Sequence, residues 1–384
     1  MINHRVSALK GSSTLKSTAL TNKLKKEGKD VVNFTAGEPD FDTPDFVKAA
    51  AKDAIDKGLT KYTPSAGYLD LRQAIAKKLQ TENGLTYADG DIIVTTGAKY
   101  AIYIGLVTVL CEGDEVLLPA PYWVSYPEMV NLCGAKVKLI CTEPQNNFRI
   151  DLKVLEKSIT PKTKLLILNY PSNPTGNTYS KKELEAIAAI VDKHDLYVLS
   201  DEIYEKLLYD GQKHVSFAGL PKMHARTLTV NGFSKSAAMT GWRLGYLAGP
   251  TEIMIQACKV VDHTTSCACS ISQRAGLAAF SDTGWQKAMN QEFEKRRNVL
   301  YQGLSGLEKL IPFKPQGAFY MFCDISKTGL KSEEFCSKLL ADQLVSCIPA
   351  DSFGAEGYIR LSFATSMADI EKGITRIKKF LNSL

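Results

Sequence analysis

The chain has 384 residues, 45% of them hydrophobic and 23% charged, a composition typical of a globular protein and a length that favours two domains. Its 47 basic and 41 acidic residues are interspersed and leave a net charge of +6, and no nucleic-acid-binding motif accompanies the basic clusters, so we expect no nucleic-acid partner. No apolar run reaches the roughly 18–20 residues that span a bilayer, so we expect no membrane segment.

Short apolar runs recur along the chain, and each is followed by a turn and then a helical pattern, which indicates a parallel α/β sheet. These runs are residues 92–94, 115–118, 165–168, 196–199 and 227–230. From about residue 285 the pattern changes to long helices with short apolar runs at 319–322 and 358–362. We therefore predict a large domain, 31–284, with a mostly parallel central sheet and helices on both faces. Residues 1–30 and 285–384 are expected to form a smaller α+β domain.

One β-α-β unit is clear from its turn residues. After the run 165–168, Pro171 and Gly176 interrupt regular structure. Ser180 and Glu183 then form the pattern of a capping box at the start of a helix. The helix carries one apolar stripe, Leu184, Ile187, Ala188 and Val191. The run 196–199 follows as the next strand, which we expect to be parallel to the first.

The N-terminus and the cysteines favour a cytoplasmic location. No apolar signal core follows Met1, so nothing predicts export. The nine cysteines are scattered and lack the C-x-x-C spacing of zinc or redox sites. We expect buried, reduced thiols and no metal.

Residues with distinctive chemistry follow the predicted strands, where parallel sheets bind their ligands. They are Gly97, Ala98, Lys99, Trp123, Asn173, Asp201, Tyr204, Ser234 and Lys235. Together they offer an anion site at a helix start, an aromatic plane, an acid, a phenol and a lysine. This set matches the needs of a phosphorylated pyridine aldehyde.

Four longer motifs resemble the class I aminotransferases, in the branch of bacterial aspartate aminotransferases that also includes prephenate aminotransferases. The motifs are residues 37–44, 169–176, 200–204 and 231–246. The resemblance implies the fold type I of enzymes that depend on pyridoxal 5′-phosphate. It also implies reversible transfer of the amino group of aspartate to 2-oxoglutarate, giving oxaloacetate and glutamate, by a ping-pong mechanism. A bifunctional aspartate/prephenate enzyme, or one with another amino donor, remains an alternative.

By this resemblance Lys235 is the catalytic residue: it bonds covalently to the cofactor at rest and then carries the substrate proton. An amine must be neutral to attack a carbonyl, and both burial and the charge of Arg243 should lower its pKa. Asp201 should keep the pyridine nitrogen protonated. Asn173 and Tyr204 are expected to bind the ring oxygen and Trp123 to stack on the ring, with Trp123 and Asn173 also bordering the substrate.

The phosphate is expected at the helix start formed by Ala98 and Lys99, where free N–H groups and the helix dipole favour an anion. Ser234 and Arg243 would add a hydroxyl and a guanidinium. Tyr62 resembles a tyrosine that a partner subunit supplies to this phosphate. The resemblance therefore implies a homodimer with shared active sites.

Arg360 is expected to bind the α-carboxylate of the amino-acid or 2-oxo-acid substrate, because a guanidinium presents two parallel N–H groups. Gly37 would approach the same substrate through its backbone. By resemblance, Lys99 with Ser12 and Thr14 reads a second carboxylate, which predicts dicarboxylic substrates.

Two further basic residues are candidates for contact with the substrate. Lys10 corresponds to a basic residue of prephenate-active relatives, or is simply part of a polar tail. Arg274 is near in sequence to the distal-carboxylate arginine of other branches, but it falls in a helical stretch that does not fit that role.

Two other classes fit less well. Residues 13–16 and 327–329 match the S-x-x-K and K-T-G elements of penicillin-recognising enzymes, but the first segment is polar and the S-D-N element is missing. A regulatory protein with an aminotransferase-like domain would carry an additional DNA-binding domain. Turnover with aspartate would exclude a purely regulatory role.

Overall fold

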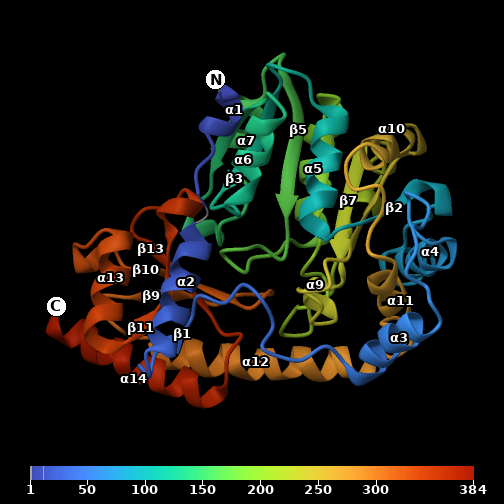
Figure 1. The fold of residues 1–384 in the computed structure, drawn as a ribbon. Helices are drawn as coiled ribbons and strands as arrows, with labels where there is room; N and C mark the ends of the chain where they lie inside the picture. Colours follow the sequence, from blue (N-terminus) through green and yellow to red (C-terminus); the bar gives the residue numbers. More distant parts are fainter. Residues whose placement is uncertain (1, 12) are drawn as a thin grey trace.

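The computed structural model describes residues 2–11 and 13–384, and its centre is a seven-stranded sheet (Figure 1). The strand order is β2-β8-β7-β6-β5-β3-β4, and within this sheet β8 alone runs against the others. The strands are β2 (Ile92–Thr95), β3 (Glu115–Ala120), β4 (Lys136–Cys141), β5 (Thr163–Asn169), β6 (Tyr197–Asp201), β7 (Thr227–Gly232) and β8 (Gly245–Ala248). The predicted mostly parallel sheet is confirmed.

Helices cover both faces of this sheet. Successive strand side chains point to opposite faces, and in β5 Leu165 and Ile167 join one apolar core while Leu166 and Leu168 join another. This double burial explains why the run is apolar throughout. One face carries α5 (Ala98–Val109), α6 (Ser125–Leu132) and α10 (Thr251–Asp262), and the other α7 (Leu152–Ser158) and α8 (Lys181–Lys193). A third group packs beside β2 and β8: α3 (Asp45–Asp56), α4 (Leu69–Asn83) and α11 (Ser270–Ala278).

The β5-α8-β6 unit forms as predicted. Ser180 accepts from the backbone N–H of Glu183, whose carboxylate accepts in return from the N–H of Ser180 at 2.7 Å. The two strands are parallel, with Leu166 opposite Val198. The unit ends at Asp201, so the helix start and the strand register together fix the position of that carboxylate.

The C-terminal part of the chain builds a second, antiparallel sheet in the order β12-β13-β10-β9. The short strand β1 pairs in parallel with β11, with Val32 opposite Val345, so the N-terminal segment joins this part. Val32 and Phe34 lie in the same apolar core as the C-terminal helices. The elements are β1 (Val32–Asn33), β9 (Ile311–Phe313), β10 (Tyr320–Asp324), β11 (Val345–Ser346), β12 (Ile348–Pro349), β13 (Tyr358–Ser362), α13 (Ser332–Gln343) and α14 (Met367–Ser383).

Helix α12 (Gly284–Leu304) connects the two sheets along the base of the molecule (Figure 1). At its start Gln286 donates to the carbonyl oxygen of Ser236 at 3.0 Å. At its end Leu300 and Leu304 are fully buried in the core of the second sheet. Its 21 residues correspond to a rod of about 30 Å.

The remaining elements lie outside the two sheets and the helices already named. They are α1 (His4–Ser7), α2 (Ser13–Lys26), α9 (Phe233–Ser236) and 3-10 turns at Asp89–Asp91, Pro144–Asn146, Phe217–Gly219, His224–Arg226, Ser326–Thr328 and Ala350–Phe353. Among residues 2–11 and 13–384, no helix has both the length and the apolar character needed to cross a membrane. All nine cysteines are free, but the expectation of buried thiols holds only for Cys323, Cys336 and Cys347, and Cys111, Cys141 and Cys269 are exposed.

Candidate active site

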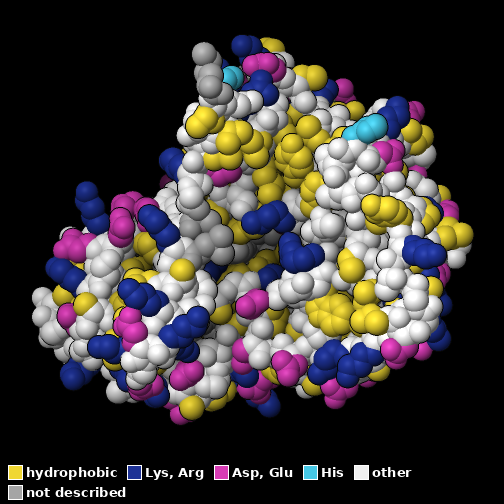
Figure 2. Space-filling model, in the orientation of Figure 1, with side chains coloured by type: hydrophobic (Ala, Val, Ile, Leu, Met, Phe, Trp, Pro, Cys, Tyr) yellow, Lys and Arg dark blue, Asp and Glu magenta, His cyan; other side chains and the backbone are white. Residues whose placement is uncertain are grey.

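A cavity of about 420 Å³ opens where the carboxyl ends of the large sheet face the second sheet. Figure 2 shows this hollow at the centre of the molecule, with Lys and Arg side chains on its rim. The predicted site residues that line it are Thr14, Gly37, Ala98, Lys99, Trp123, Asn173, Asp201, Tyr204, Ser234, Lys235, Arg243 and Arg360. Ser12 lies outside the described residues, and Tyr62 does not line the cavity of its own chain. Segments far apart in sequence therefore meet here.

Lys235 sits on α9, directly after β7, and its amine points into the cavity. Nζ donates to the carbonyl oxygen of Gly37 and lies 5.6 Å from the ring centre of Phe319. Burial lowers the pKa of this amine to about 8, and the positive charges of Arg360 and Arg243 act in the same direction. Nearby carboxylates oppose the shift only in part. The neutral, nucleophilic amine is thus accessible close to physiological pH.

Asp201 ends strand β6 and is 4% exposed. Its Oδ2 accepts from the hydroxyl of Tyr126 at 2.7 Å and its Oδ1 from the N–H of Ile203 at 3.2 Å. Burial raises the pKa of Asp201 to about 6, although the hydrogen bond from Tyr126 acts against this rise. The carboxylate is therefore held in a defined orientation beside the cavity.

Arg360, on β13, reaches across to the large sheet and is 2% exposed. Nη1 donates to the side-chain oxygen of Asn173 at 2.9 Å and Nη2 to the carbonyl oxygen of Thr35 at 3.0 Å. Its guanidinium lies over the ring of Tyr320, 4.2 Å from the centroid. Nε has no hydrogen-bond partner among the described residues. A buried guanidinium with an unused N–H is suited to an anionic ligand.

Tyr204 follows β6 and is buried beside these groups. Its hydroxyl lies 2.9 Å from that of Tyr320, on β10. Burial raises the pKa of Tyr204 well above its usual value, so the phenol stays protonated. It can donate one hydrogen bond and accept another.

Another positively charged part of the cavity lies at the start of α5, beside Arg243. Gly97 has φ +84°, in the left-handed region that favours glycine, and a Cβ there would lie 2.7 Å from Nη2 of Arg243. Arg243 itself donates to the carbonyl oxygen of Thr240 at 2.8 Å and forms no ion pair among the described residues. The free N–H groups of the helix start, the Ser234 hydroxyl and this cation suit a phosphate.

Lys99 contributes a further cation to the cavity. Its Nζ lies 4.9 Å from the ring centre of Trp123 and forms no ion pair with a described carboxylate. Burial and the charge of Arg243 lower the pKa of Lys99. The contact between the cation and the ring holds the ammonium beside the indole.

Tyr62 is 90% exposed. The segment that follows is anchored by Gln273 of α11, which is fully buried and binds the N–H of Tyr68 at 2.7 Å and the hydroxyl of Thr63 at 3.0 Å. The next residue, Arg274, lies over the ring of Tyr68, 3.7 Å from its centroid. Arg274 thus supports this segment and does not line the cavity.

Sequence reasoning missed several residues of the cavity wall. Tyr126, Tyr320, Thr35 and Asn169 line it, and Asn169 accepts from the N–H of Asn173 at 2.9 Å. Tyr126 could have been predicted from its spacing, because it follows Trp123 by three residues at the start of a helix, where side chains at this spacing share a face. Tyr320 and Thr35 come from segments whose position depends on the tertiary fold.

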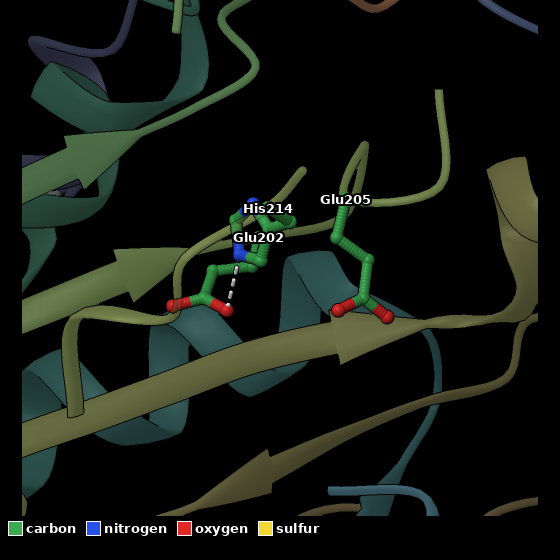
Figure 3. A group of neighbouring side chains, drawn as sticks. All are labelled: Glu202, Glu205 and His214. Atoms are coloured by element: carbon green, nitrogen blue, oxygen red, sulfur yellow. Dashed lines mark hydrogen bonds and ion pairs between the residues drawn. The ribbon is translucent and has the colours of Figure 1, made fainter. Parts of the chain in front are cut away.

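A separate group of titratable residues is formed by Glu202, Glu205 and His214 (Figure 3). Nε2 of His214 lies 2.7 Å from Glu202, toward which it points in the figure. Glu205 accepts from the Lys78 ammonium and from Asn83 at 2.8 Å. Because Lys78 supplies a positive charge to Glu205 and His214 contacts Glu202, a structural role accounts for this group.

Comparison with known proteins identifies the family. The model for aminotransferase class I and II matches residues 29–377. The aspartate aminotransferase of Geobacillus stearothermophilus is 43% identical, covering 99% of this chain and 98% of that protein. The bifunctional aspartate aminotransferase and glutamate/aspartate-prephenate aminotransferase of Petunia hybrida is 44% identical, covering 99% and 82%. A structure of Thermus thermophilus aspartate aminotransferase with maleate superposes with a TM-score of 0.95 at 41% identity, covering 99% of both chains. The chain belongs to the class I and II aminotransferases.

Enzymes of this family depend on pyridoxal 5′-phosphate, and the chain has their fold type I. The cavity fits this cofactor on three counts. The corner at Gly97 and Arg243 presents a cation and helix N–H groups that no described carboxylate neutralises. Asp201 presents an oriented carboxylate of the kind that a protonated ring nitrogen needs. Lys235 places an amine with a lowered pKa within the same cavity.

Proposed function

We propose that the chain is an aspartate aminotransferase that transfers the amino group of aspartate to 2-oxoglutarate. The observation that carries this proposal is that, apart from Arg243 at the proposed phosphate site, two cations without an ionic partner among the described residues, Arg360 and Lys99, share one cavity with Lys235. Two cations suit a substrate with two carboxylates. The Thermus thermophilus relative is seen together with maleate, which is a dicarboxylate, in agreement with this proposal.

In this proposal the cofactor, when bound, withdraws the electrons released at the substrate Cα. Asp201 stays charged and keeps a proton on the ring nitrogen. Ser234, Arg243 and the start of α5 hold the phosphate, while Asn173 and Tyr204 donate to the ring oxygen and Trp123 covers the ring.

Lys235 performs the proton transfer. Its amine is the group of this cavity whose pKa of about 8 allows it to accept a proton and release it again near neutral pH. Arg360 holds the α-carboxylate through its fork, and Gly37 offers backbone atoms at the same end of the substrate. Lys99, with Ser12 and Thr14, holds the distal carboxylate.

We further propose a cytoplasmic homodimer in which Tyr62 of each subunit donates to the phosphate in the other. Its high exposure and the buried anchor at Gln273 support this role. Within one subunit, residues 31–284 would act as the cofactor domain, and 1–30 with 285–384 as the small domain that carries Arg360.

The test is a panel of amino donors assayed with 2-oxoglutarate on the wild type and on Lys99→Ala. Loss of a charge-assisted contact of about 1.5–3 kcal/mol should lower kcat/KM for aspartate and glutamate about 10- to 100-fold and spare alanine. Lys164→Ala is the matched control, because Lys164 makes the same kind of contact with Tyr197, 5.2 Å from its ring centre, away from the cavity. Acidic donors no better than alanine, or unaffected by Lys99→Ala, would contradict the proposal.

Prephenate is a second candidate acceptor, favoured by the similarity to the bifunctional Petunia hybrida enzyme. Lys10 does not line the cavity, but its backbone N–H donates to Glu128 at 3.2 Å, which ties the N-terminal segment to α6. The same panel with prephenate as acceptor, repeated on Lys10→Ala, tests this activity.

A further inference from the structure

The hydroxyl of Tyr126 and the carboxylate of Asp201 form a buried pair at the wall of the cavity. The two side chains are 1% and 4% exposed, and the O···O distance is 2.7 Å. Tyr126 lies in the first turn of α6, whereas Asp201 ends β6, so the contact joins two elements through residues that are 75 positions apart. Asp201 is the acid that the cofactor ring requires. Whatever holds it therefore acts on the cofactor.

The groups around Asp201 act in opposite directions on its ionisation, and the hydrogen bond from Tyr126 is one of those that favour the carboxylate. Burial favours the neutral acid, and Glu202, which follows it, acts in the same direction. Tyr126 from α6, the N–H of Ile203 and Lys235 from α9 favour the carboxylate. Tyr126 supplies the hydroxyl donor among these groups and binds Oδ2, while Ile203 binds Oδ1. The two donors occupy one lone pair on each oxygen and fix the plane of the group.

The ring of Tyr126 has a second contact. It packs edge-on against Trp123, with ring centres 5.2 Å apart and planes at 80°. This arrangement is a favoured geometry for aromatic pairs. One side chain thus contacts both the acid that faces the ring nitrogen and the indole that faces the ring.

We propose that Tyr126 is a positioning residue for pyridoxal phosphate: its hydroxyl keeps Asp201 ionised and oriented toward the ring nitrogen, and its ring fixes the plane of Trp123. This inference rests on the cofactor of the family and is independent of which amino donor the enzyme prefers. The hydroxyl of Tyr126 acts on Asp201, and its ring acts on Trp123. The hydroxyl can therefore be removed while the ring is kept.

The test is Tyr126→Phe, measured as the dissociation constant of pyridoxal phosphate from the apoprotein by fluorescence titration. A hydrogen bond to a charged group contributes about 1.5–3 kcal/mol, so we expect about tenfold weaker binding or more. The pH titration of the bound cofactor's absorbance should also shift, because Asp201 would protonate at higher pH. Tyr170→Phe is the matched control: this tyrosine is fully buried and donates to the carbonyl oxygen of Val215 at 3.0 Å, outside the cavity.

A double-mutant cycle separates positioning from general packing. In an Asp201→Asn background, Tyr126→Phe should have no further effect on cofactor affinity, because its target has lost the charge. Equal weakening in both backgrounds would show that Tyr126 acts only as part of the wall and would overturn the proposal. Unchanged affinity and an unchanged pH titration in Tyr126→Phe alone would overturn it as well. Thermal unfolding of the apoprotein shows whether each variant is folded.

Discussion

Arg360 and Asn173 are joined by a 2.9 Å hydrogen bond although 187 residues separate them in sequence. Arg360 comes from the antiparallel sheet and Asn173 from the loop after β5. The proposed ligand of the α-carboxylate is therefore positioned by a proposed ligand of the cofactor ring. Substrate and cofactor binding should be coupled through this contact.

Arg360→Lys should lower kcat/KM for aspartate by about 100-fold or more. A lysine keeps the charge but cannot maintain the bonds to Asn173 and Thr35 and also present a fork to the substrate. Steady-state kinetics measure the effect. Arg376→Lys, on α14 and paired with Asp30, is the control and should be nearly normal.

Glu38→Gln should shift the pH dependence of cofactor attachment to lower pH. The carboxylate of Glu38 raises the pKa of Lys235, against the lowering by burial that brings it to about 8. Without this charge the pKa falls further, and the neutral amine is populated at lower pH. Glutamine still accepts the hydrogen bond from Thr240. The rate of reconstitution with pyridoxal phosphate, followed by absorbance across the neutral to alkaline range, gives the midpoint. An unchanged midpoint would contradict the assigned interaction; Glu334→Gln, on α13, is the control.

Tyr62→Phe should weaken pyridoxal phosphate binding about tenfold if its hydroxyl binds the phosphate. Subunit mixing then tests whether it acts across the interface. In a shared site, Lys235 comes from one chain and Tyr62 from the other. A hybrid of one Tyr62→Phe chain and one Lys235→Ala chain therefore has one site that carries both substitutions and one site that carries neither. Cofactor titration and activity of the re-associated mixture should therefore reveal tight, active sites that neither parent has. Absence of such sites would contradict sharing.

Lys78→Met should lower the free energy of unfolding of the apoprotein by about 3 kcal/mol at neutral pH, because it leaves Glu205 buried and without its main cation. Burial alone would raise the pKa of Glu205, but electrostatic interactions with Lys78, His214 and Lys206 and the hydrogen bond from Asn83 together lower it to about 2. A lowered carboxyl pKa stabilises the fold above the unfolded value of about 4.5, and this contribution is lost as the pH falls toward 2.

The difference between wild type and Lys78→Met should therefore shrink below about pH 4, the range in which the unfolded glutamate is protonated. Urea unfolding at several pH values measures it. Lys57→Met, which breaks an exposed pair with Asp53, should change stability little at any pH. A pH-independent difference for Lys78→Met would indicate lost packing and not lost charge.

The sequence was most informative where function depends on the end of a strand. Asp201, Asn173 and Lys235 were predictable because parallel strands end at one edge of a sheet. The contacts that orient these three side chains could not be predicted. They involve Tyr126, Tyr320 and Thr35, which lie on elements whose packing no local sequence pattern specifies. The reversed direction of β8 also escaped prediction, because the short α9 turn between β7 and β8 does not resemble a two-residue hairpin.

Helix α12 connects the backbone next to Lys235 with the C-terminal core. Its first turn is bonded to the backbone at Ser236, next to Lys235, and its last turn is embedded among the C-terminal helices, where Gly303 leaves no room for a side chain beside Ile374. A helix of this length transmits displacement along its axis with little bending. We therefore expect a bulky substitution at residue 303 to shift α12 and, through the bond between Gln286 and Ser236, the turn that carries Lys235.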